Sequence, residues 1–233
     1  IWKFIRQNAR GRSAAAVLRR LEGKPLFLCP LQLSGDFQIR AHSPFPDMKS
    51  AVSYVIESFA AHAPADAHLL IKSHPLDCSF ADWGGLAASH AERLAISGRV
   101  HFVDGGSLDE MVQMARAMVC VNSTSATLAL AEDKPVCTIG EAIYDMPGLT
   151  HQGHLDSFWV KPTSPEPGLY RAFRRVLVDR CLVRGGLASE SAVSELIGSL
   201  LDRLLRVPGS LRAIAPPVEN DEASQASRTA RSA

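Results

Sequence analysis

Short apolar runs alternate with segments of helical spacing through most of this chain, and this alternation constrains the fold more than any other feature. Between the apolar runs, segments such as residues 47–62 place apolar side chains every three or four positions, the spacing of a helix. Near-continuous hydrophobicity is typical of parallel strands that are covered by helices on both faces. The sequence therefore predicts an α/β fold with a doubly wound parallel sheet. The expected strands are residues 25–30, 67–71, 100–103, 118–121 and 135–139.

Three regions follow from the change of composition along the chain. Residues 1–24 form a basic helical lead-in, for which contact with a membrane surface and packing on the domain are both open. Residues 25–207 form the α/β domain, with two C-terminal helices expected over 166–181 and 189–207. Residues 208–233 are rich in Pro, Glu, Asn, Ser, Ala and Arg, which predicts a disordered tail.

Composition excludes several classes of function. A net charge of +1 over 233 residues gives no general attraction to nucleic acid. No apolar run approaches the ~20 residues that span a bilayer, and no signal-peptide core is present, so we expect a cytoplasmic chain. The first residue is Ile, which leaves open a longer gene product. The five cysteines are dispersed without a CxxC pair, so we expect buried thiols in a reducing compartment.

Polar residues follow two of the expected strands directly. Lys72-Ser73-His74-Pro75 ends one, and Asn122-Ser123-Thr124-Ser125 ends another and opens a helical segment. Open α/β sheets bind ligands at the carboxyl ends of their strands, and hydroxyls with backbone N–H groups at a helix start suit phosphate. Together the two motifs predict a nucleotide-sugar pocket.

Each motif also has a structural interpretation. A lone histidine at a strand end commonly makes a structural hydrogen bond, and the side chain of Lys72 could point away from the edge. Ser123, Thr124 and Ser125 could cap a helix, with or without a phosphate. Asn122 could hold the loop or contact the ligand.

Five motifs occur in a compatible order, and together they carry a family resemblance. They are Pro30-Leu31-Gln32 with Asp36-Phe37-Gln38-Ile39 and His42-Ser43; Ile71-Lys72-Ser73-His74-Pro75-Leu76-Asp77; Val121-Asn122-Ser123-Thr124-Ser125; Lys134-Pro135-Val136; and Tyr144, Gly148-Leu149-Thr150, Gln152-Gly153, Leu155-Asp156 and Phe158-Trp159. From about Pro25 to Trp159 the chain resembles the capsule polysaccharide biosynthesis family of bacterial β-Kdo transferases.

The resemblance implies a Rossmann-like half of a GT-B glycosyltransferase. Such an enzyme moves the acidic sugar Kdo from the donor CMP-Kdo to a glycolipid or growing Kdo linker on a lysophospholipid anchor. It implies no cofactor besides this donor, capsule assembly proteins as partners, and peripheral contact with the inner face of the inner membrane.

The resemblance assigns a role to His74, and the residue pattern after the first strand suggests roles for Asp36, Gln32 and His42. His74 would contact the donor phosphate or ribose, with Pro75 fixing the turn that aims it. Asp36, which is ionised at pH 7, is the candidate general base, and the alternative is a turn-forming aspartate after Gly35. Gln32 and His42 would support the cleft, with His42 as a competing base.

Later residues complete the expected site. Gln152 and Asp156 follow the last strand and would contact the donor ribose or cytosine, while Tyr144 would pack on the base. His151 and His154 flank Gly153, but no carboxylate–histidine pattern at helical spacing supports a metal, so none is expected.

Family members carry further sequence before the Pro-Leu-Gln motif, whereas 29 residues precede Pro30 here. One sheet of about five strands supplies one of the two Rossmann-like domains of a GT-B enzyme. We therefore expect the nucleotide-binding half, with most of the partner domain missing. The alternatives are a non-catalytic nucleotide-sugar-binding module of a capsule assembly or export complex, and a different nucleotide-sugar enzyme, such as a sialyltransferase-like or epimerase-like protein.

Overall fold

The computed structural model describes residues 2–77 and 81–205, with side chains from residue 11 onward. The chain divides into two compact units, Ile1–Leu177 and Val178–Ala233. The unit boundary lies inside the domain expected over 25–207, and the predicted tail at 208–233 lies outside the described residues. The domain scheme drawn from the sequence stays a prediction.

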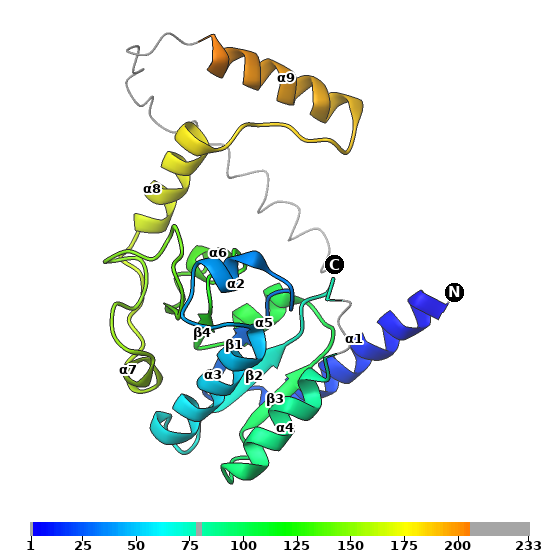
Figure 1. The fold of residues 1–233 in the computed structure, drawn as a ribbon, viewed down its shortest axis with the longest axis vertical. Coiled ribbons are helices and arrows are strands. Elements are labelled where there is room, and N and C mark those ends of the chain that lie inside the picture. Colours follow the sequence, from blue (N-terminus) through cyan, green and yellow to red (C-terminus); the bar gives the residue numbers. More distant parts are fainter. Residues whose placement is uncertain (1, 78–80, 206–233) are drawn as a thin grey trace, which may run out of the picture. The chain divides into compact units, whose positions relative to one another are not determined.

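A five-stranded sheet with the order β3-β2-β1-β4-β5 forms the centre of the first unit (Figure 1). All neighbouring strands are parallel, so the predicted fold class is confirmed. The chain builds outward from β1 to β3 and then returns to place β4 on the other side of β1, which creates a topological switch point between β1 and β4. The strands are β1 (Leu26–Pro30), β2 (His68–Lys72), β3 (Val100–Val103), β4 (Ala117–Cys120) and β5 (Val136–Thr138).

Helices cover both faces of this sheet because successive strand residues point to opposite sides. Phe27 belongs to a buried cluster with side chains of α3 (Met48–His62), α4 (Trp83–Arg93) and α7 (Leu155–Val160). Its neighbour Leu28 belongs to a second cluster, on the other face. That cluster contains side chains from α1 (Trp2–Leu21), α5 (Leu108–Met114), α6 (Ala126–Ala131) and α8 (Leu169–Val176).

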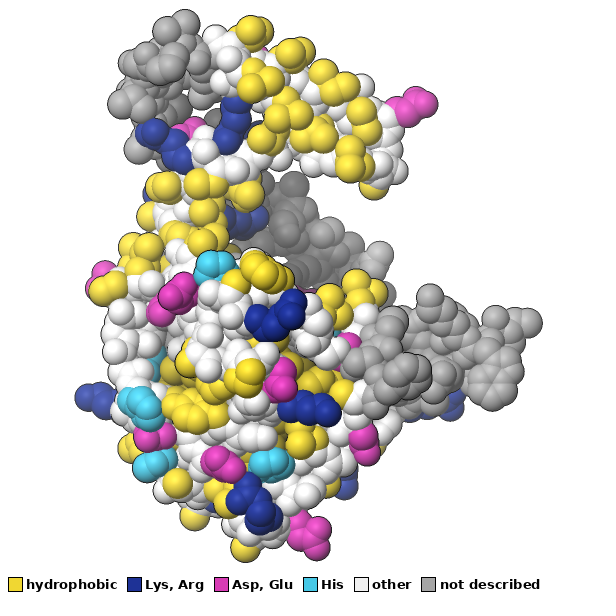
Figure 2. Space-filling view, viewed as in Figure 1, with side chains coloured by type: hydrophobic (Ala, Val, Ile, Leu, Met, Phe, Trp, Pro, Cys, Tyr) yellow, Lys and Arg dark blue, Asp and Glu magenta, His cyan; other side chains and the backbone are white. Residues whose placement is uncertain are grey.

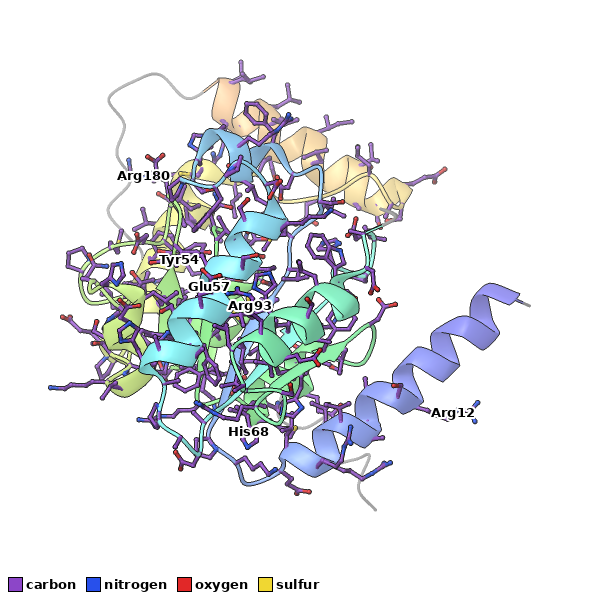
Figure 3. The ribbon with its side chains drawn as sticks, turned by 60° about the horizontal axis from the view of Figure 1, so that its bottom comes forward. Arg12, Tyr54, Glu57, His68, Arg93 and Arg180 are labelled. Atoms are coloured by element: carbon purple, nitrogen blue, oxygen red, sulfur yellow. The ribbon has the colours of Figure 1, made fainter. Side chains whose placement is uncertain are left out.

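Side-chain caps fix where several helices begin. Asp47 accepts a 2.8 Å hydrogen bond from the Ser50 N–H at the start of α3, as expected. Asp82 accepts one of 2.8 Å from Gly85 N–H at the start of α4. A Cβ on Gly85 would lie 2.3 Å from Asp82 Oδ2, so the glycine allows this cap to form. Arg93 then links α4 to α3 through a 2.7 Å contact with Glu57 (Figure 3).

Several helices are shorter than the sequence pattern predicts. The helical pattern of residues 107–117 extends beyond α5, which stops at Met114. The pattern of residues 124–132 begins before α6, which starts at Ala126. Within the described ranges, no helix has the length and hydrophobicity required to cross a membrane. A short helix, α2 (Phe37–Ala41), lies between β1 and α3, in a segment whose turn residues Ser34, Gly35 and Pro44 favour a loop.

The second unit contains α9 (Glu190–Leu204), preceded by a π-helical turn over Leu177–Cys181. Within this unit Arg203 donates hydrogen bonds of 2.6–3.1 Å to the carbonyls of Val178, Asp179 and Arg180. α9 has no buried residue, and hydrophobic side chains lie exposed along it (Figure 2). The exposed apolar residues of this helix and its end are Ile197, Leu200, Leu201, Leu204 and Leu205.

The cysteines follow the expectation of buried thiols in part. Cys29, Cys120 and Cys137 are free and buried, whereas Cys181 is exposed. Burial raises the pKa of the Cys29 and Cys137 thiols to about 12. These buried thiols therefore stay protonated near neutral pH and act as small apolar side chains.

Candidate functional site

The carboxyl edge of the sheet brings the two sequence motifs together. β1 lies between β2 and β4, so about 10 Å separate the ends of β2 and β4 at the usual strand spacing. His74 follows β2, Ser123 follows β4, and Gln32 follows β1 between them. This is the switch-point edge, where open α/β sheets bind ligands.

Gln32 and Asn122 tie β1 to β4 at the switch point. Gln32 Nε2 donates to Asn122 Oδ1 at 2.8 Å, and the Asn122 backbone N–H donates to Gln32 Oε1 at 3.1 Å. The second Nε2 hydrogen of Gln32 reaches Asp36, and Asn122 Nδ2 donates to the carbonyls of Gln38 and His42. Each side-chain amide has two N–H donors, and both are used here. The pair therefore fixes the segment 36–42 over the edge of the sheet.

His74 is held in a turn that sets its tautomer. Its Nδ1 accepts a 3.1 Å hydrogen bond from the Leu76 backbone N–H, so the neutral ring carries its proton on Nε2. Nε2 has no hydrogen-bond partner among the described residues and can donate to a ligand. Pro75, in this turn, is exposed, and Asp77 anchors the turn by accepting 2.8 Å bonds from Ser34 Oγ and Trp83 Nε1.

Lys72 is buried beneath this turn. Its Nζ donates to the carbonyl of Ser73 at 3.1 Å, and Lys72 is only 6% exposed. Burial lowers the pKa of Lys72, and the negative charge of Asp104 opposes that shift. Ser73 Oγ donates to Asp104 Oδ1 at 2.5 Å. Asp104 follows β3 directly, and its position after a strand is the signal that pointed to His74. Asp104 was not among the residues predicted from the sequence.

Hydrogen bonds between its own residues hold the Ser123–Ser125 loop. Ser123 Oγ bonds Ser125 Oγ at 2.7 Å and accepts the Ser125 backbone N–H at 3.2 Å. The N–H groups of residues 126–128 bond the carbonyls of residues 123–125. α6 has only six residues, and its N-cap Ser125 makes no side-chain capping bond. The polar groups that remain for a ligand are those of Ser123 and Thr124, of which Thr124 is exposed.

Tyr144 supports this loop from below. It is 2% exposed, and its hydroxyl donates to the Ser123 carbonyl at 2.5 Å. Burial raises its pKa, so the phenol keeps its proton. The expectation that Tyr144 packs on a nucleotide base is therefore wrong, because its ring lies in the core.

Asp36 is the N-cap of α2. Its Oδ1 accepts the Gln38 backbone N–H at 2.9 Å, and its Oδ2 accepts Gln32 Nε2 at 3.1 Å. Each carboxylate oxygen can accept a further hydrogen bond, so capping and proton acceptance are compatible. Its role as general base stays a prediction.

His42 is exposed and pairs with Glu141 after β5, with 3.2 Å between Nδ1 and Oε2. Its backbone carbonyl accepts the Glu141 N–H at 2.7 Å. A Cβ on Gly140 would lie 2.8 Å from this carbonyl, so the segment around His42 sits directly on the ends of β4 and β5.

Gln152 and Asp156 lie in different surroundings. The His151 N–H bonds the carbonyl of Val136 in β5, and Gln152 Nε2 lies 3.3 Å from Oδ1 of Asp145, which follows Tyr144. Gln152 Nε2 donates to Thr150 Oγ1 at 2.9 Å. The predicted ligand contacts of these two residues stay predictions.

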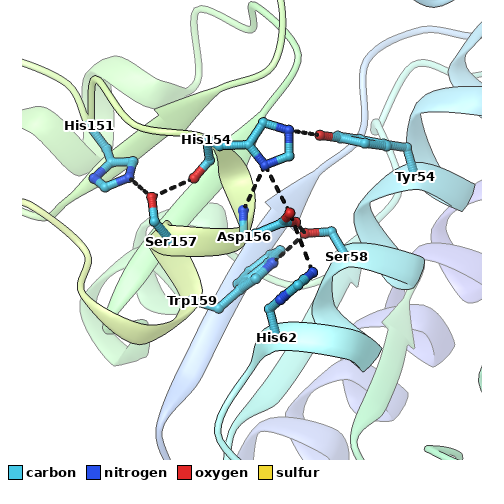
Figure 4. A network of polar contacts seen from close by, with 8 residues as sticks. All are labelled: Tyr54, Ser58, His62, His151, His154, Asp156, Ser157 and Trp159. Carbon is cyan, nitrogen blue, oxygen red and sulfur yellow. Dashed lines mark hydrogen bonds and ion pairs between the residues drawn. The ribbon is translucent and has the colours of Figure 1, made fainter.

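Asp156 instead attaches α7 to the C-terminal half of α3 (Figure 4). It accepts Ser58 Oγ at 2.6 Å and lies 2.9 Å from His154 Nδ1 and 3.3 Å from His62 Nε2. Ser58 also accepts the indole N–H of buried Trp159 at 2.8 Å. The network joins the two helices.

His151 and His154 bond different partners. His151 Nε2 lies 3.0 Å from Ser157 Oγ, and His154 Nε2 lies 3.2 Å from the Tyr54 hydroxyl. In the part of the chain that the structure describes, no group of three or more His, Cys, Asp or Glu residues could hold a metal ion.

A comparison with known proteins identifies the family of this chain. A family model described as "Capsule polysaccharide biosynthesis protein" matches residues 1–187. The chain belongs to the capsule polysaccharide biosynthesis protein family.

Two relatives of this capsule polysaccharide biosynthesis protein are similar over part of their length. The capsule polysaccharide modification protein LipB of Neisseria meningitidis is 38% identical over 165 residues, which is 70% of this chain and 39% of LipB. The capsule polysaccharide export protein KpsS of Escherichia coli is 35% identical over 152 residues, which is 65% of this chain and 39% of KpsS. The chain thus spans 39% of the length of these relatives.

A solved structure is also similar to part of this capsule family member. Thermosulfurimonas dismutans KpsC, described as a beta Kdo 2,7 transferase, has a TM-score of 0.42 and 22% sequence identity. The match covers 61% of this chain and 44% of the KpsC chain.

Proposed function

We propose that this chain is the donor-binding, Rossmann-like half of a GT-B glycosyltransferase that moves Kdo from CMP-Kdo to a capsule glycolipid or Kdo linker. Family membership supports a role in capsule polysaccharide biosynthesis. The observation that carries the donor site is His74, whose Nδ1 accepts a backbone N–H and leaves a protonated Nε2 at the switch-point edge. The proposed donor is CMP-Kdo, with no further cofactor.

The transfer requires hydrogen-bond donors for the leaving phosphate and a proton acceptor for the attacking hydroxyl. As the bond between the anomeric carbon and the CMP phosphate breaks, negative charge grows on the leaving phosphate. His74 Nε2–H and the Ser123 and Thr124 groups donate hydrogen bonds to it. Asp36 accepts the proton of the acceptor hydroxyl, whose oxygen forms the new bond to the anomeric carbon. The products are CMP, the lengthened glycan and a proton on Asp36 that passes to solvent.

Calorimetry of CMP and CMP-Kdo binding to the wild type, His74→Ala and Ser123→Ala tests the donor site. We expect wild-type binding and at least a tenfold loss, about 1.4 kcal/mol, in each folded variant. Ser53→Ala is the matched control, because the Ser53 hydroxyl contacts the Lys49 carbonyl and His90 and none of the candidate site residues. A folded wild type that binds neither ligand contradicts the proposal.

A non-catalytic module is the second candidate function. The match spans 39% of the length of LipB and of KpsS, and the described residues contain one five-stranded sheet. In this role the chain binds CMP-sugar and contacts capsule assembly proteins without turnover. Kdo transfer to a lysophospholipid-linked acceptor, assayed with the chain as it stands, separates the two candidates.

The cellular setting is also a proposal. We expect the chain in the cytoplasm, with peripheral contact at the inner face of the inner membrane, where a lysophospholipid-linked acceptor lies. Arg12, Arg19 and Arg20 give α1 positive charge for anionic headgroups. Cosedimentation with anionic vesicles, compared with neutral ones, measures this contact.

A further inference from the structure

A carboxylate lies beside the His74 turn at the same edge of the sheet. Asp104 follows β3, and β3 pairs with β2 through Val103 and Lys72. The Ser73 backbone N–H bonds the Val103 carbonyl at 3.0 Å, and Ser73 Oγ bonds Asp104 Oδ1 at 2.5 Å. Ser73, the residue directly before His74, therefore joins the His74 turn to Asp104.

The nucleoside of a bound nucleotide must lie on either the β5 side or the β3 side of its phosphate. On the β5 side, the segment around His42 covers the strand ends. Its carbonyl accepts the N–H of Glu141 and one hydrogen of Asn122 Nδ2, and it lies against Gly140. On the β3 side, the strand ends are followed by the His74 turn and by Asp104, which is half-buried. A nucleoside that extends from a phosphate at His74 toward β3 would lie beside Asp104.

The charge at this position suits a sugar diol better than a phosphate or a carboxylate. A carboxylate accepts hydrogen bonds and repels anions, and a ribose presents two adjacent O–H donors. Acidic residues near the carboxyl edge of dinucleotide-binding sheets bind ribose in this manner. Lys72 is buried below, and the negative charge of Asp104 acts against the burial that lowers the pKa of Lys72.

We propose that Asp104 accepts hydrogen bonds from the ribose hydroxyls of the donor nucleotide, with Ser73 Oγ fixing the carboxylate. The inference rests on the proposed function, since it requires a ribonucleotide donor. It makes Asp104 a residue that selects a ribonucleotide over a deoxyribonucleotide.

Binding of CMP and 2′-deoxy-CMP to the full chain, measured by calorimetry, tests the assignment. Wild type should bind CMP about tenfold more tightly than 2′-deoxy-CMP, because the deoxynucleotide lacks one hydrogen bond to a charged group. Asp104→Asn should lower CMP affinity about tenfold and bring the ratio of the two affinities close to one. Asp109→Asn makes the same charge change at an exposed position of α5 and should leave the ratio unchanged.

Ser73→Ala is the second variant and keeps the charge of Asp104 while releasing its carboxylate. It should reduce the preference for CMP, and it decides the question if Asp104→Asn does not fold. A folded Asp104→Asn with the wild-type preference, alongside weakened CMP binding in His74→Ala, overturns the role of Asp104 alone. A folded wild type that binds neither nucleotide overturns the proposed function and this inference together.

Discussion

At the scale of single residues, hydrogen-bond capacity separates groups that hold the site from groups that remain for a ligand. Gln32 and Asn122 use both donors of each side-chain amide within the protein, so they position the loop. His74 uses one ring nitrogen, which leaves the other as a donor. Asp36 uses one acceptor position on each oxygen and keeps others.

Asp36→Asn should abolish Kdo transfer while leaving CMP-Kdo binding and stability close to wild type. Asparagine is as good an N-cap as aspartate, so α2 keeps its cap, but the amide cannot accept the proton. Transfer assays and calorimetry on the same preparation measure both properties. Asp36→Ala should lose the cap as well, at about 1 kcal/mol of stability. Transfer at the wild-type rate by Asp36→Asn would remove this residue from the chemistry.

At the scale of secondary-structure elements, the attachment of α7 to α3 depends on one carboxylate. The hydrogen bond from Ser58 lowers the pKa of Asp156, and the nearby His154 and His62 lower it further. Trp159, fully buried, packs edge-on against Phe27 and Phe59, with ring centroids 5.1 and 5.3 Å away. Polar and aromatic contacts thus fix the same helix.

The stability provided by Asp156 should depend on pH. Its folded pKa lies below the unfolded value of about 3.9, so the contribution is complete above that value and is lost as pH falls through the lowered folded pKa. Urea unfolding of wild type and Asp156→Asn should therefore differ by about 1 kcal/mol at pH 7 and converge in acid. Asp109→Asn is the control for a carboxylate outside the network. An equal difference between wild type and Asp156→Asn at pH 7 and pH 3 would rule out this contribution.

At the scale of the whole molecule, the hydrophobic core lies entirely within the first unit. Every buried hydrophobic residue that the structure describes lies between Ala14 and Trp159, and α9 contributes none. The sheet and the candidate donor site belong to the same unit, Ile1–Leu177. The described buried apolar side chains that stabilise the sheet therefore belong to this unit.

A chain ending at Leu177 should fold in one cooperative transition and bind CMP as the full chain does. The buried apolar surface that stabilises the sheet is retained, and the exposed leucines of α9 are removed. Denaturation followed by circular dichroism, with calorimetry of CMP, checks both points. Loss of the transition in the shortened chain would show that residues after 177 contribute to the core.

Local patterns in the sequence determined the parallel sheet, its five strands and the polar residues that follow β2 and β4. The spacing of apolar residues indicates whether a segment is a helix or a strand and which face each side chain lies on. Both properties depend on neighbours in the sequence.

Only the tertiary structure decided which loops meet. It paired Gln32 with Asn122, joined Asp156 to Ser58 of α3, buried Tyr144 and placed Asp104 beside Ser73. The physical reason is that a loop's position depends on packing and hydrogen bonds between residues far apart in the chain, which no local pattern contains.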